Sequence, residues 1–259
     1  MILDRVRRPP FLDAPRPLAF AHRGGAAEGL ENTMTAFARA VDAGYRYVET
    51  DVHATADGVL VAFHDPTLDR VTDRTGRISA LPLREVRAAR VGGTERVPLF
   101  DDLLDTWPQL RINIDVKADD TVEPLIAALR RHDALHRVCV GSFSDARLAR
   151  IRAAFGGEVA TSLGPRDVAR LRIASLTGIR PRFAPGVCAA QIPIRRAGIR
   201  LVDARFLNTA HRSGLDVHVW TIDDPDTMRR LLDLGVDGIM TDRIDVLRDV
   251  LTARGHWAA

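Results

Sequence analysis

Lysine is almost absent from this sequence, because only Lys117 among the 37 basic residues is a lysine. Such wholesale use of arginine is typical of coding bias. A position that stays lysine under that bias indicates a need for a compact ammonium group rather than a planar guanidinium. Lys117 is therefore a candidate functional residue, although a single lysine can also survive by chance.

Cysteine is scarce as well, and the two that occur, Cys139 and Cys188, lie far apart within apolar runs. Buried free thiols fit that setting and suit a reducing cytoplasm. No apolar run approaches the roughly 18 residues that a membrane span needs. The first ten residues are not followed by an apolar stretch, so they do not resemble a secretory signal. We expect a cytoplasmic protein without stable membrane insertion.

The chain also lacks a block of like charge. Its net charge is +3, and its arginines are spread beside acidic residues without basic–aromatic interleaving. This pattern argues against a nucleic-acid partner. An apolar content of 46% supports a sizeable core, and we expect a single domain over residues 1–259. The oligomeric state is left open.

Extended apolar runs alternate with helical patterns from end to end. This alternation predicts an α/β fold, a (β/α)8 TIM barrel over residues 17–252. A doubly wound sheet is the competing fold, but no Gly-x-Gly-x-x-Gly turn follows the first strand. An additional short strand is expected at 59–63, and a small insertion near residues 65–100. The eight barrel strands are expected near 18–22, 46–51, 111–116, 137–142, 158–162, 187–192, 216–221 and 236–241.

Cap residues suggest where several helices begin and end. Asn32 is a plausible N-cap for a helix that stops at Gly44. Asp224, followed by proline, is typical of a second N-cap, and Gly235 closes that helix. Asp242 is expected to cap the last helix.

Several polar side chains coincide with strand ends. Alternation along a strand places Glu49 and Asp51 on one side, and Asp115 and Lys117 on one side of the next strand. In a barrel, the carboxyl ends of the strands form the active-site face. We therefore expect one mouth to collect His22, Arg23, Glu49, Asp51, Asp115, Lys117 and Trp220.

Three carboxylates in one mouth require compensation. For a single acidic pair, ion pairing with local arginines is the better explanation. For three acids on adjacent strand ends, a bound hard cation accounts better for the pattern, and oxygen ligands favour Mg²⁺ or Ca²⁺ over zinc.

Two histidines extend this pattern. His22 alone could be an ordinary strand-end residue, and His64 could cap a turn with the following aspartate. Beside a metal site, one imidazole can accept a proton while the other donates one. Arg23 and Lys117 supply positive charge for a phosphoryl oxygen. His53 and His211 are interpreted as surface residues, and His218 as a residue that could line the pocket.

Four stretches resemble the glycerophosphodiester phosphodiesterase family. They are AHRGGAAEGLENTMTAFARAVDAGYRYVETDVHATADGVLVAFHDPTLDRVTDRTG, INIDVK, GLDVHVWTIDD and GVDGIMTDR, and the resemblance runs from about Leu18 to Leu251. It implies a TIM barrel with a small insertion, and hydrolysis of glycerophosphodiesters to glycerol 3-phosphate and an alcohol.

The same resemblance implies roles for individual residues. His22 and His64 would be catalytic, and the glycerol 2-hydroxyl could attack first to give a cyclic phosphate. We favour His22 as base and His64 as acid. One Mg²⁺ or Ca²⁺ would be bound by Glu49, Asp51 and Asp115; Arg23 and Lys117 would contact phosphate, and Trp220 would wall the pocket. The family usually has glutamate where Asp115 stands, and often asparagine where Asp223 stands.

Two alternatives remain at this point. Related barrels that resemble sphingomyelinase D and lysophospholipase D act on lipid phosphodiesters, for which Phe183, Phe206 and Trp220 could form an apolar track. A barrel that binds phosphate compounds without catalysis is the other alternative. The preferred head group would depend on loops 65–98, 164–186 and 193–200.

Overall fold

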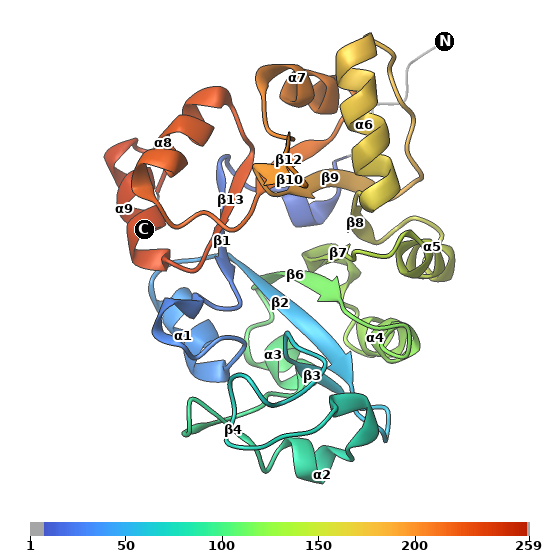
Figure 1. Ribbon diagram of the computed structural model, residues 1–259, viewed down its shortest axis with the longest axis vertical. Coiled ribbons are helices and arrows are strands. Elements are labelled where there is room, and N and C mark those ends of the chain that lie inside the picture. The colour runs from blue at the N-terminus through green and yellow to red at the C-terminus, as the bar shows by residue number, and fades with distance from the viewer. Residues whose placement is uncertain (1–7, 258–259) are drawn as a thin grey trace.

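The computed structural model describes residues 8–257 and contains a closed barrel of eight parallel strands with helices around it (Figure 1). The strand β1 pairs with both β2 and β13, which closes the barrel. All eight predicted barrel strands are present, and the predicted TIM barrel is confirmed. Their bounds are β1 Leu18–His22, β2 Tyr47–Ala54, β6 Arg111–Val116, β7 Val138–Gly141, β8 Ala160–Ser162, β9 Val187–Ile192, β12 Asp216–Val219 and β13 Gly238–Thr241. The prediction that the N-terminus is not a secretory signal concerns mainly residues 1–7, which lie outside the described range.

The helices follow the strands in the order expected of such a barrel. They are α1 Met34–Asp42, α2 Leu83–Val86, α3 Phe100–Thr106, α4 Val122–Arg131, α5 Asp145–Ala154, α6 Pro165–Thr177, α7 Ala204–Arg212, α8 Pro225–Leu234 and α9 Ile244–Ala253. Short 3-10 turns lie at η1 Pro10–Leu12, η2 Ala26–Glu28, η3 Ile78–Ala80 and η4 Ala134–Arg137. No helix within residues 8–257 is long and apolar enough to cross a membrane.

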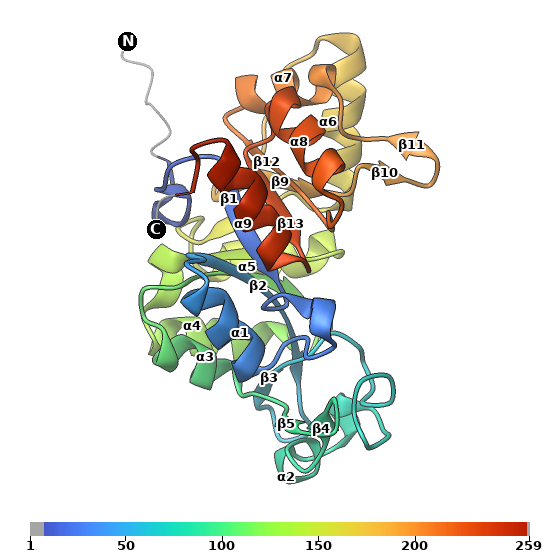
Figure 2. The same cartoon turned by 90° about the vertical axis from the view of Figure 1, so that its left-hand side faces the viewer.

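The extra short strand is confirmed as β3 Leu60–Ala62, which pairs antiparallel with the end of β2. It leads into the predicted insertion, which contains η3, α2 and a small ladder of β4 Arg90–Val91 with β5 Glu95–Arg96. The insertion has its own apolar cluster, including Phe63, Leu68 and Ile78. Figure 2 shows it below the barrel, at the opposite end of the view from α7. A second excursion, β10 Arg195–Arg196 and β11 Ile199–Arg200, forms an antiparallel hairpin after β9.

Aromatic and small side chains fill the inside of the barrel. Phe20 and Tyr47 pack at a centroid distance of 5.0 Å, and Phe11 from η1 packs edge-on against Tyr47 at 5.3 Å. The two cysteines belong to this cluster as buried free thiols, as expected. This cluster fills part of the barrel interior, and the cavity described below opens at the carboxyl ends of the strands, as in other barrels of this kind.

Two expected caps are wrong and two are confirmed. Asn32 does not cap α1, because its φ of 56° is left-handed and an N-cap needs extended backbone. Thr33 caps instead and accepts a hydrogen bond from the Ala36 amide. Asp242 does not cap α9, whose N-cap is Arg243 without a side-chain bond. Asp224 and Gly235 begin and end α8 as expected.

Candidate active site

A cavity of about 700 Å³ opens where the barrel strands end. The register of the sheet brings its polar residues together, because His22 pairs with Glu49, Glu49 with Asn113, and Asp51 with Asp115. The cavity is lined by every residue that the sequence singled out for chemistry: His22, Arg23, Glu49, Asp51, His64, Asp115, Lys117 and Trp220.

His22, at the end of β1, is held on both sides of its ring. Its Nδ1 lies 2.7 Å from Asp242 Oδ1, and its Nε2 lies 3.7 Å from Glu49 Oε2. Burial acts to lower the pKa of His22, but the Glu49 charge and the Asp242 hydrogen bond raise it above its usual value. Asp242 is in turn positioned by Asp223, whose Oδ1 accepts a hydrogen bond of 2.8 Å from the Asp242 amide.

Lys117 lies between two of the three carboxylates. Its Nζ is 2.8 Å from Asp51 Oδ1 and 2.6 Å from Asp115 Oδ2. Arg23 donates its backbone amide to Glu49 Oε2 at 3.1 Å and places Nε 3.2 Å from Asp51 Oδ2. The single lysine of the chain therefore balances carboxylate charge directly, which supports the inference drawn from its survival.

The three acids differ in their electrostatic state. Burial raises the pKa of Glu49 to about 7, and the charge of Asp51 acts in the same direction. Burial would also raise the pKa of Asp51, but Lys117 and Arg23 hold it below its usual value. Burial raises the pKa of Asp115 against the effect of Lys117. The three carboxylates therefore sit in one cavity with different proton affinities, and Lys117 and Arg23 are the cations in direct contact with them.

The donor set fits a hard cation in its chemistry. Asp115 Oδ1 is buried and has no hydrogen-bond partner, and an unsatisfied buried oxygen of this kind is costly unless a ligand contacts it. Carboxylate oxygens are the ligands that Mg²⁺ and Ca²⁺ prefer. In residues 8–257, however, no group of three or more His, Cys, Asp or Glu side chains is arranged to hold a metal ion. Lys117 contacts two of the three acids in this structure.

His64 follows β3 and belongs to a second chain of contacts. Its Nδ1 lies 2.5 Å from Asp65 Oδ1, and Arg70 Nε donates to Asp65 Oδ2 at 2.5 Å. Arg70 also donates to both oxygens of Glu31, which accepts from Arg23 Nη1 at 3.0 Å. Sequence reasoning missed Glu31 and Arg70. The signal for Glu31 was its place in the loop between β1 and α1, which opens on the active-site face.

Asn32, which the sequence analysis assigned to a helix cap, contacts one of the site carboxylates instead. Its Nδ2 donates to Asp51 Oδ2 at 3.0 Å, and its Oδ1 accepts from Thr50 Oγ1 at 2.8 Å. The loop that carries Asn32 begins with a turn after β1, and this turn needs Gly24, whose φ is +81°. A Cβ there would lie 2.9 Å from the backbone of Ala36.

The three remaining histidines of the sequence analysis differ in how well their predicted positions hold. Those of His53 and His218 are wrong, and that of His211 is confirmed. His53 is buried rather than on the surface, and its Nε2 lies 3.1 Å from the His64 carbonyl oxygen. His218 is fully buried inside the barrel, 4.9 Å from the Phe20 ring, and does not line the cavity. His211 is exposed, as expected.

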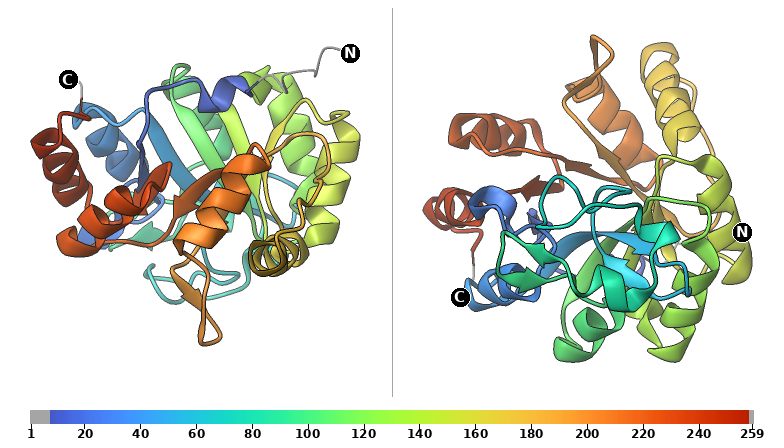
Figure 3. Two further views of the ribbon diagram at one scale, coloured as in Figure 1. Left: turned by 90° about the horizontal axis from the view of Figure 1, so that it is seen from above. Right: turned by 60° about the horizontal axis from the view of Figure 1, so that its bottom comes forward.

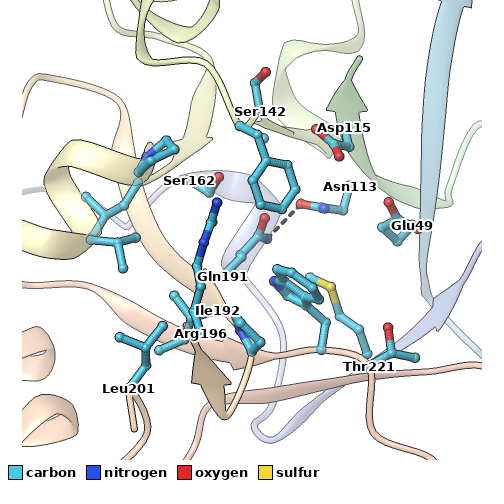
Figure 4. A pocket seen from close by; sticks show the side chains of 18 of the residues that line it. Glu49, Asn113, Asp115, Ser142, Ser162, Gln191, Ile192, Arg196, Leu201 and Thr221 are labelled. Atoms are coloured by element: carbon cyan, nitrogen blue, oxygen red, sulfur yellow. Dashed lines mark hydrogen bonds between the residues drawn. The ribbon is translucent and has the colours of Figure 1, made fainter. Parts of the chain in front are cut away.

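The cavity has two unlike sides. Figure 4 shows Glu49, Asn113 and Asp115 on one side, with a hydrogen bond of 2.7 Å from Gln191 Nε2 to Asn113 Oδ1. Ile192 and Leu201 lie on the other side in the same view. Trp220 lines the cavity and packs edge-on against Phe143 at a centroid distance of 5.9 Å.

The fold and the site together define a TIM-barrel enzyme whose mouth combines histidines, carboxylates and cations. Residues 22–246 match the model of the glycerophosphoryl diester phosphodiesterase family. The chain belongs to this family and is a phosphoric diester hydrolase, which disfavours a non-catalytic binding barrel.

Individual relatives agree with this assignment. The "Probable glycerophosphodiester phosphodiesterase 2" of Mycobacterium tuberculosis is 41% identical over 251 residues, which cover 95% of each chain. A lysophospholipase D of Rattus norvegicus is 26% identical, with 89% of this chain and 85% of that one covered. A phosphodiesterase of Oleispira antarctica, solved with the product sn-glycerol-3-phosphate, shares the fold with a TM-score of 0.76. It is 23% identical, and the match covers 92% of this chain and 97% of that one.

Proposed function

We propose that the protein hydrolyses glycerophosphodiesters to glycerol 3-phosphate and an alcohol, with one divalent cation and with His22 and His64 as the acid–base pair. The observation that carries this proposal is the convergence of both imidazoles, three carboxylates and two cationic side chains on one cavity. Each type of group has a task in phosphodiester cleavage: proton transfer, cation binding and charge stabilisation.

The histidines divide the proton transfers. Asp242 occupies Nδ1 of His22, which leaves Nε2 beside Glu49 as the nitrogen that can take the proton from the attacking glycerol 2-hydroxyl. His64, oriented by Asp65, gives a proton to the oxygen of the departing alcohol. Water then opens the cyclic phosphate, and the protons return by the reverse transfers. Arg23 and Lys117 hold the phosphoryl oxygens.

Glu49, Asp51 and Asp115 would hold the cation, either Mg²⁺ or Ca²⁺. The unpartnered oxygen of Asp115 and the raised pKa of Glu49 support this assignment. When bound, the cation supplies positive charge that neutralises charge developing on the phosphoryl group.

Chelation tests the proposal. Glycerol 3-phosphate release from glycerophosphocholine, glycerophosphoethanolamine, glycerophosphoglycerol and glycerophosphoinositol is measured before and after EDTA treatment. We expect activity to disappear with EDTA and to return on addition of Mg²⁺ or Ca²⁺. Full activity after EDTA would contradict the metal dependence, and no turnover of any head group with either ion would contradict the reaction.

A second candidate substrate class is a lipid phosphodiester with one acyl chain. The apolar side of the cavity favours it, although not through the track first expected, since Phe206 is buried in α7 and Phe183 does not line the cavity. Relative kcat/KM for lysophosphatidylcholine and glycerophosphocholine separates the two classes. A higher value for the lysolipid would make it the preferred substrate.

A further inference from the structure

Among the described residues, the large hydrophobic side chains that are exposed gather in one region. They are 51 to 66% exposed, and they are Phe143, Ile173, Leu176, Ile179 and Ile199. Four of them lie on α6, the loop after it or the β10–β11 hairpin. The fifth, Phe143, lies 5.1 Å from the guanidinium of Arg196 on the hairpin. Residues 165–182 and 193–200 together with Phe143 are called the α6–hairpin rim below.

The rim is also strongly cationic. Its residues include eight arginines and one acid, Asp167, a formal charge of +7 in a chain whose total is +3. The sequence analysis expected arginines spread evenly beside acidic residues, and this expectation is wrong for the α6–hairpin rim. Three of these arginines pair with Asp145, Asp167 and Asp203. Within residues 8–257 the other five pair with no carboxylate and are exposed: Arg180, Arg182, Arg195, Arg196 and Arg200.

The rim borders the mouth of the cavity. Ile173 of α6 and Arg196 and Ile199 of the hairpin line the cavity as well as the rim. Helical spacing places Ile173 and Leu176 on one face of α6, opposite to the buried Leu171 and Ser175. Figure 2 shows the hairpin projecting from the body of the molecule, and Figure 3 shows the same projection from above.

We propose that the α6–hairpin rim docks on an anionic lipid bilayer, with the cavity mouth at the lipid surface. Exposed aliphatic side chains among unpaired arginines match the interface of such a bilayer, where hydrocarbon and negative charge lie a few ångströms apart. The contact is peripheral, since no helix of residues 8–257 could span the membrane.

Other occupants fit the rim less well. A nucleic acid would match the charge but not the exposed isoleucines and leucine, because bases stack on aromatic rings and guanidinium planes. A second copy that used the same face would bring two surfaces of charge +7 together, which is unfavourable.

Vesicle sedimentation tests the proposal without turnover, so its result is independent of the proposed function. The protein is mixed with vesicles of phosphatidylcholine alone or with about one-third phosphatidylglycerol at low salt. We expect at least tenfold tighter binding to the anionic vesicles, and a loss of that difference as salt screens the arginines. Equal binding to both vesicle types, or binding to neither, would overturn the proposal.

Two double variants locate the contact. Leu176→Ser/Ile179→Ser removes apolar surface, and Arg180→Glu/Arg182→Glu reverses charge; none of these residues lines the cavity. Each is expected to weaken binding to anionic vesicles at least tenfold while glycerophosphocholine turnover stays unchanged.

A charge-matched control removes the simple effect of net charge. Arg46→Glu/Arg84→Glu alters exposed arginines before β2 and on α2, outside the rim, and should bind vesicles nearly as the unaltered protein does. An equal loss in this control would overturn the location. A dimer that Leu176→Ser/Ile179→Ser dissociates, measured by light scattering, would assign the rim to a second copy instead.

Discussion

His64 is half of the proposed acid–base pair, and its environment is simple enough for a direct test. His64→Ala removes the imidazole but leaves Asp65 paired with Arg70, so the loop keeps its anchor. Loss of a general acid typically lowers the rate by about 10²–10⁴-fold. We expect a decrease of that size in kcat for glycerophosphocholine with the cation present.

His136→Ala is the matched control, because His136 is exposed, its ring bonds to the Asp133 carbonyl oxygen, and it does not line the cavity. It should turn over substrate at the normal rate. Near-normal turnover by His64→Ala would remove His64 from the mechanism.

Asp242 acts on His22 from the other side of the ring. The two residues are separated by 220 positions in the chain, so no local sequence pattern could predict their contact. The sequence indicated a helix cap for Asp242 instead. Asp242→Asn keeps the size of the side chain but removes the carboxylate that orients Nδ1. We expect kcat to decrease at least about tenfold with little change in KM.

Asp245→Asn is the control for this substitution, since Asp245 lies three residues further on, is exposed and pairs only with Arg243. It should leave kcat unchanged. Equal kcat values for the Asp242 and Asp245 variants would show that orientation by Asp242 is unimportant.

At the level of elements, the sequence predicted the strands better than the contacts between loops. The barrel strands are largely buried and rich in apolar residues, and alternation correctly placed Glu49 with Asp51 and Asp115 with Lys117. Glu31, Asn32 and Arg70 lie in loops, where side-chain direction follows from backbone turns rather than from a regular period. The sequence therefore indicated the residues on strand ends and missed those that join them.

The cap of α1 shows how a single backbone angle decides such a case. Asparagine tolerates the left-handed conformation, and Asn32 adopts it, which turns its side chain to Asp51 and leaves the cap to Thr33. Thr33→Ala removes the acceptor for the Ala36 amide. We expect the free energy of unfolding to fall by about 1 kcal/mol, within the usual range for such caps.

Urea titration measures this change, with Thr106→Ala as control. Thr106 is exposed at the end of α3, and its hydroxyl bonds only to a carbonyl within that helix. A loss of stability no larger than that of the control would mean that Thr33 does not cap α1.

On the scale of the whole molecule, an ion network ties the chain together at the amino end of the barrel. Arg16, just before β1, pairs with Asp216 and lies 3.2 Å from Asp237 Oδ1. Asp237 also accepts from the Val217 amide at 2.8 Å and from His211 at 2.7 Å. The network joins the segment before β1 to β12, to the residue before β13 and to α7.

The hydrogen bond to Asp237 raises the pKa of His211 above its ordinary 6.5. A raised folded-state pKa stabilises the fold fully below the unfolded value near 6.5, and this contribution is lost as the pH rises through the folded value. Because the His211 side chain is 40% exposed, screening limits the effect to about 0.5 kcal/mol. His211→Gln should therefore destabilise the protein more at pH 5.5 than at pH 8.5, measured by urea unfolding. The exposed control His136→Gln should show no such difference, and an equal loss at both pH values for His211→Gln would exclude the ionic contribution.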